Sequence, residues 1–66
     1  MRNKGLNKIA QKVGEEGVET VIAALAETEE DLIGEASDLV FHLLFLLKEK
    51  GLSIQDIAKN LKKRHQ

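Results

Sequence analysis

The stretch "LVFHLLFLL", residues 39–47, decides the fold of this 66-residue chain. It is apolar around its whole helical circumference except at His42, and a helix of that kind is buried on more than one side. The chain has no proline and no alternating run of β-branched residues, so the periodicity is helical throughout. We therefore expect an all-α fold.

Cap and stop residues around this stretch divide the chain into helices. Thr28 followed by Asp31 is a capping-box-like start, and Ser53 followed by Asp56 repeats it. Gly51 is a typical C-terminal stop for the helix before it. The pattern predicts three helices, over residues 4–27, 28–50 and 53–64.

The length of the chain limits how well those helices can bury residues 39–47. Sixty-six residues make a single domain, residues 1–66, and a chain this short buries only about 60% of its unfolded surface. It has no cysteine, so no disulfide can stabilise it. We therefore expect a helical bundle of about three helices per chain, completed by a homodimer or a higher even oligomer.

Charge and hydropathy exclude several classes of protein. The formal net charge is −1, whereas nucleic-acid binding needs a concentrated basic surface. The longest apolar run is well short of the roughly 20 residues that span a bilayer. The polar N-terminus is unlike a signal peptide. These features predict a cytoplasmic protein with no nucleic-acid or membrane partner.

The first predicted helix carries a concentration of acid in "KVGEEGVET", residues 12–20. At roughly 100° per residue, Lys12, Glu16 and Glu19 fall in one strip, with Glu15 beside it. Like charges at this spacing destabilise a helix. The two glycines of the stretch cost about 1 kcal/mol each in a helix interior, which predicts close approach of another backbone or a ligand.

The second predicted helix presents a matching pair, Glu35 and Asp38. If the two helices pack antiparallel, Glu16 and Glu19 can face this pair. Four converging carboxylates cannot all stay ionised without a cation. A hard divalent ion with oxygen ligands fits, and Mg²⁺ is the expected one for a phosphate substrate. Lys12 could then reach a phosphate oxygen.

Simpler interpretations compete with this metal site. Lys12 can pair with Glu15 or Glu16 as an ordinary solvated face. However, Glu35 and Asp38 directly precede the most apolar stretch, where acids are rarely buried unpaired. His42 can be a core histidine with one hydrogen bond, and this is the favoured interpretation of a lone histidine in an apolar run. Alternatively it contacts substrate or orients Asp38.

The quoted segments resemble a known family. "KGLNKIAQKVGEEGVETVIAAL", "EASDLVFHLLFLL" and "GLSIQDIAKNLKKRH" are similar to phosphoribosyl-ATP pyrophosphohydrolases, a branch of the all-α NTP pyrophosphohydrolases. The superfamily signature is E-E-x-x-E followed by E-x-x-D. In this chain the signature residues are Glu15, Glu16, Glu19, Glu35 and Asp38.

The resemblance implies cleavage of phosphoribosyl-ATP to phosphoribosyl-AMP and pyrophosphate in histidine biosynthesis, with Mg²⁺ as cofactor. It also implies a dimer. Carried over by position, the metal ligands are Glu16, Glu19, Glu35 and Asp38. Glu15 assists the metal shell or the attacking water, and Lys12 and Lys8 meet phosphate oxygens.

Two other functions stay open. One is a house-cleaning nucleotide pyrophosphohydrolase of the same superfamily, although the wording "KVGEEGVET" favours the phosphoribosyl-ATP branch. The other is a non-catalytic helical dimerisation module. Family members usually carry a further helix before the equivalent of "KGLNKIAQK", and residues 1–66 are expected to lack it.

Overall fold

Three α-helices account for almost all of residues 4–65, the part of the chain that the computed structural model describes. They are α1 (Lys4–Ala26), α2 (Glu29–Glu49) and α3 (Ile54–Arg64), and there is no strand in this range. The all-α class and the three predicted helices are confirmed. Over the same residues, no helix is both long and apolar enough to cross a membrane.

Both predicted capping boxes are present. The Thr28 hydroxyl accepts from the backbone N–H of Asp31 at 3.1 Å, and the Asp31 carboxylate accepts from the backbone N–H of Thr28 at 3.4 Å. Before α3, the backbone N–H of Ser53 donates to the Asp56 carboxylate at 2.9 Å. These contacts satisfy backbone donors that the first turn of a helix leaves unpaired.

The end of α2 explains the glycine that follows it. Gly51 has a φ of +76°, a conformation that costs other residues steric strain. The backbone N–H of Leu52 donates to the carbonyl of Leu47 at 2.8 Å, and that of Gly51 donates to Lys48 at 3.0 Å. This is the Schellman pattern of helix termination, and it turns the chain away from α2.

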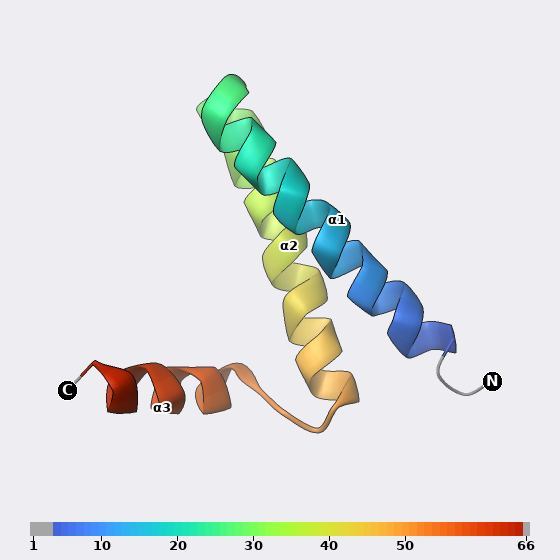
Figure 1. Cartoon of the computed structure of the whole chain (residues 1–66), viewed down its shortest axis with the longest axis vertical. Coiled ribbons are helices and arrows are strands. Elements are labelled where there is room, and N and C mark those ends of the chain that lie inside the picture. Colours follow the sequence, from blue (N-terminus) through green and yellow to red (C-terminus); the bar gives the residue numbers. More distant parts are fainter. Residues whose placement is uncertain (1–3, 66) are drawn as a thin grey trace.

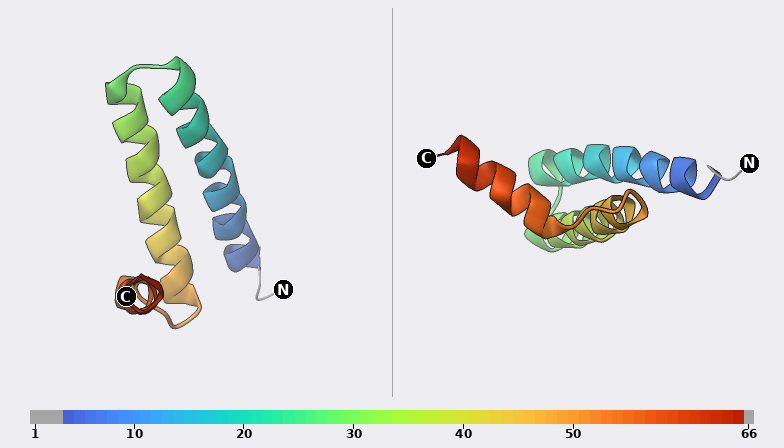
Figure 2. Two further views of the ribbon diagram at one scale, coloured as in Figure 1. Left: turned by 60° about the vertical axis from the view of Figure 1, so that its left-hand side comes forward. Right: turned by 90° about the horizontal axis from the view of Figure 1, so that it is seen from below.

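The helices α1 and α2 form an antiparallel hairpin, joined by the short turn at Thr28 (Figures 1 and 2). In Figure 1, α3 extends sideways from the far end of α2. The molecule measures 41 × 35 × 14 Å, and its short dimension is close to the 10–12 Å diameter of one helix. Its radius of gyration is 13.8 Å, against about 11 Å for a compact domain of this length. One copy is therefore close to a single layer.

A single layer leaves the apolar side chains uncovered. Among the described residues, Ala23 is the one buried apolar residue, at 1% exposure, and it lies where α1 meets α2. Phe41 is 62% exposed and Ile33 is 66% exposed. The expectation that three helices cannot cover residues 39–47 is confirmed, whereas the oligomer that would cover them stays a prediction.

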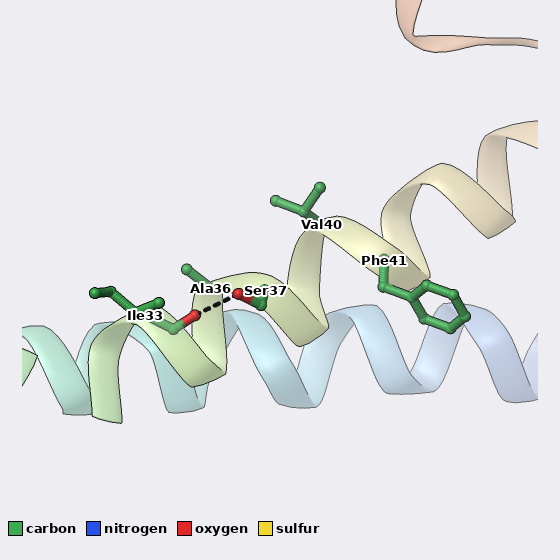
Figure 3. A pocket seen from close by; sticks show the side chains of 5 residues that line it. All are labelled: Ile33, Ala36, Ser37, Val40 and Phe41. Atoms are coloured by element: carbon green, nitrogen blue, oxygen red, sulfur yellow. Dashed lines mark hydrogen bonds between the residues drawn. The ribbon is translucent and has the colours of Figure 1, made fainter. Parts of the chain in front are cut away.

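One shallow apolar surface is lined by α2 alone, and we call it the α2 face (Figure 3). Its lining residues are Ile33, Ala36, Ser37, Val40 and Phe41. Ser37 does not disturb this surface, because its hydroxyl donates to the backbone carbonyl of Ile33 at 2.7 Å. A partner could therefore bury the α2 face without leaving that hydroxyl unpaired.

Two of the three glycines in α1, Gly14 and Gly17, differ from expectation. A Cβ atom placed on Gly14 or Gly17 would meet no other atom within 4 Å. The predicted close approach of another backbone is therefore wrong within the described part of this chain. The physical reason is the single-layer architecture, in which only one side of α1 meets another helix.

Candidate functional site

A carboxylate and an imidazole join the two helices of the hairpin at its centre. Glu16 of α1 is buried, at 8% exposure, and its Oε1 lies 2.7 Å from Nδ1 of His42 on α2. The same Nδ1 lies 3.2 Å from the backbone carbonyl of Asp38. Both predicted residues therefore lie together, and a hydrogen bond offsets part of the cost of burying the acid.

This contact corrects one expectation about His42. The sequence favoured a core histidine with one hydrogen bond, and the alternatives were contact with substrate or orientation of Asp38. In the structure, His42 is half-buried and contacts the carboxylate of Glu16 together with the backbone of Asp38. The reason is helix geometry. A side chain points back over the preceding turn, toward the carbonyl four residues earlier, while the hairpin brings Glu16 alongside.

Glu19 and Glu35 form the second link between α1 and α2. Glu35 is half-buried, and this partial desolvation raises the pKa of its carboxyl above the ordinary value of 4.5. Repulsion by the Glu19 charge and a hydrogen bond to Glu19 raise the pKa further, with smaller contributions from Asp38 and Glu27. Glu19, from the predicted pair on α1, is thus close to Glu35, from the predicted pair on α2.

The contacts are pairwise, and the four predicted ligands are not gathered around one point. Within residues 4–65, no three His, Asp or Glu side chains are placed together as they would be around a metal ion. Glu19 and Asp38 are both exposed. The donor set nevertheless fits a hard cation, because all four side chains offer carboxylate oxygens. Desolvation and then the neighbouring charge of Glu19 raise the pKa of Glu35, and a cation would relieve that repulsion.

The remaining predicted residues line the exposed side of α1. Lys8, Lys12 and Glu15 are all exposed. Among the side chains that the structure describes, no lysine or arginine nitrogen lies within 4 Å of a carboxylate. The predicted alternative, in which Lys12 pairs with Glu15 or Glu16, is therefore not what the structure shows.

Two residues near this region were not singled out from the sequence. Gln11 donates from its side-chain amide to the Glu15 carboxylate at 3.0 Å, and Glu27 adds to the repulsion at Glu35. The spacing of four between Gln11 and Glu15 is a recognisable helical signal. Glu27 could have been found by folding the predicted hairpin about Thr28, which brings the end of α1 beside the start of α2.

Comparison with known proteins places the chain in a family. A family model described as phosphoribosyl-ATP pyrophosphohydrolase matches residues 1–65. A phosphoribosyl-ATP pyrophosphatase of Sphingopyxis alaskensis is 63% identical over 62 residues. One of Pyrobaculum calidifontis is 56% identical over 62 residues. The histidine biosynthesis bifunctional protein HisIE of Shewanella oneidensis is 56% identical over 63 residues.

These matches cover nearly all of the present chain but not of the relatives. The match to the Sphingopyxis alaskensis protein covers 94% of this chain and 57% of that protein. The match to the Pyrobaculum calidifontis protein covers 94% of this chain and 66% of that protein. The match to the Shewanella oneidensis protein covers 96% of this chain and 30% of that protein. The family match, in contrast, extends over 65 of the 66 residues and includes all five signature acids. The chain belongs to the phosphoribosyl-ATP pyrophosphohydrolase family.

Proposed function

We propose that this chain hydrolyses phosphoribosyl-ATP to phosphoribosyl-AMP and pyrophosphate, as a step of histidine biosynthesis. The observation that carries the proposal is the contact across the hairpin, in which Glu16 of α1 lies 2.7 Å from His42 of α2, four residues after Asp38, while the charge of Glu19 acts on Glu35. It brings together the two halves of the acidic signature in a chain whose family is named for this reaction. Two acids held side by side need a cation if both are to be ionised.

We propose Mg²⁺ as that cation, held by Glu16, Glu19, Glu35 and Asp38. When bound, it supplies charge neutralisation for the phosphate oxygens and the leaving pyrophosphate. The four carboxylates come from two helices joined by a capped turn. Side-chain rotation can therefore adjust the site without moving the hairpin. Glu16 is the most sheltered of the four, so its position is the most restricted.

The other side chains act on the substrate and on water. Water attacks one of the two phosphorus atoms that flank the oxygen between the α- and β-phosphates. The bond from that phosphorus to the bridging oxygen breaks, and the bridging oxygen stays with the group that is displaced. Glu15 is placed on the exposed side of α1, where it can accept a proton from water. Its hydrogen bond from Gln11 restrains the carboxylate. Lys12 and Lys8, also exposed, would meet phosphate oxygens as point charges.

The proposed enzyme works as a homodimer or a higher even oligomer in the cytoplasm. A second copy that packs on the α2 face would bury Ile33, Val40 and Phe41, which are all more than half exposed in one copy. It would also supply the second layer that stable domains require.

A substrate comparison tests the proposed reaction. Purified protein with Mg²⁺ would be given phosphoribosyl-ATP, ATP and a panel of non-canonical NTPs and dNTPs, and pyrophosphate and the nucleotide product would be measured. Release of pyrophosphate from phosphoribosyl-ATP alone is expected. Glu19→Gln should abolish it, whereas Glu30→Gln, an exposed acid in the first turn of α2, should not. Turnover of another nucleotide would indicate a house-cleaning enzyme. If the folded protein turns over none of these nucleotides, it is a non-catalytic module.

A further inference from the structure

We propose that His42 is a positioning residue that fixes the carboxylate of Glu16, rather than a residue that binds substrate. The inference deepens the proposed function, because Glu16 is one of its proposed metal ligands. It rests on one short contact between α1 and α2, Nδ1 to Oε1 at 2.7 Å. The side chains concerned are only 10% exposed on Glu16 and 25% exposed on His42, so water competes weakly for this hydrogen bond.

The partners of Nδ1 determine where the imidazole proton lies. One partner is a carboxylate oxygen of Glu16 and the other is the backbone carbonyl of Asp38 at 3.2 Å. A carbonyl has no proton to donate, and an ionised carboxylate only accepts. Both contacts are favourable together only when Nδ1 carries the proton. In the neutral ring, Nε2 then holds the lone pair.

This arrangement restrains the carboxylate of Glu16. The ring links Oε1 of Glu16 on α1 to the backbone of α2 at Asp38. Because the bond uses Oε1, the other carboxylate oxygen, Oε2, is left for a cation. Phe41 packs edge-on against the imidazole at a centroid distance of 5.1 Å and limits its rotation. Such supporting contacts commonly contribute 10- to 100-fold to metal affinity.

The position of the proton can be measured on the unsubstituted protein without any metal. Two-dimensional ¹⁵N–¹H spectra that correlate ring nitrogens with carbon-bound protons distinguish the two neutral tautomers. The chain has two histidines, and the exposed His65 after α3 serves as the internal reference. We expect His42 as the Nδ1–H tautomer and His65 as the usual mixture. A proton on Nε2 of His42 would overturn the inference.

A pair of variants tests the consequence for Glu16. In His42→Asn, the amide nitrogen is bonded to Cγ, as Nδ1 is in histidine, so it can still donate to Oε1. His42→Leu keeps the bulk but has no donor. Isothermal titration with Mg²⁺ alone should show a 10- to 100-fold weaker affinity for His42→Leu and most of the affinity retained in His42→Asn. His65→Leu is the matched control, and it should bind as the wild type does.

The outcomes separate this inference from the proposed function. Equal affinity of His42→Leu and wild type, or equal loss in both His42 variants, would overturn the positioning role. No Mg²⁺ binding by the folded wild type would contradict the proposed metal site, and the tautomer measurement would still decide the role of His42. Circular dichroism checks folding. If His42→Leu does not fold, the Asn variant and the wild-type spectrum still give the answer.

Discussion

Phe41 is the side chain whose truncation should weaken self-association most clearly. It is 62% exposed in a single copy, which leaves roughly 120 Å² of a side chain of about 200 Å² in water. At about 25 cal/mol per Å², burial of that area contributes about 3 kcal/mol per copy. In a symmetric dimer the Phe41→Ala change acts twice. The expected loss of about 4 to 6 kcal/mol corresponds to three to four powers of ten in Kd.

Sedimentation equilibrium, with circular dichroism followed on dilution, measures this effect. Wild type should lose helical signal as it dissociates, and Phe41→Ala should do so at a far higher concentration. Lys59→Ala, at an exposed position of α3, is the matched control and should behave as wild type. A wild-type species of monomer mass that keeps its full helical signal at nanomolar concentration would refute the reasoning. So would a Phe41→Ala dimer as tight as wild type.

Three further outcomes follow from single contacts. Because the pKa of Glu35 is raised, the native state binds more protons than the unfolded state. The metal-free protein should therefore lose stability as the pH rises from about 4.5 through that raised value, and urea titrations should show this dependence vanish in Glu35→Gln. Thr28→Ala, which removes the cap of α2, should lower the free energy of unfolding by about 1 kcal/mol, while Thr28→Ser keeps it. Gly14→Ala should raise the free energy of unfolding by about 1 kcal/mol through helix propensity, and the unfolding temperature with it, since a Cβ there meets nothing; a lower unfolding temperature would show that a partner or ligand occupies that space.

Local signals predicted the helices well. The capping boxes at Thr28 and Ser53 and the stop at Gly51 each depend on residues within a few positions of one another. Such contacts can be recognised from spacing alone. The packing of α3 depends instead on contacts between distant segments, and no local signal showed that it would lie away from the hairpin.

The sequence named the acids of the candidate site, but it could not give the way they pair. Helical periodicity placed Glu16 and Glu19 on one strip of α1, and the structure brings both to α2. Which acid meets which partner depends on the offset of the two helices along their axes. Periodicity around a helix carries no information about that offset. Orientation of Asp38 on the same helix was thus only one of the alternatives for His42, beside a core position and substrate contact, and its carboxylate partner is Glu16 across the hairpin.

If the proposed reaction takes place at this site, acids from both helices act as one magnesium-dependent unit. The most direct measurement is kcat/KM for pyrophosphate release from phosphoribosyl-ATP, over a range of Mg²⁺ concentrations, in Glu19→Gln, Glu35→Gln and the double variant. Residues that serve one site give grossly non-additive losses. The double variant should therefore be no worse than the poorer single variant. Losses that simply add, or single variants as active as wild type, would contradict a shared site.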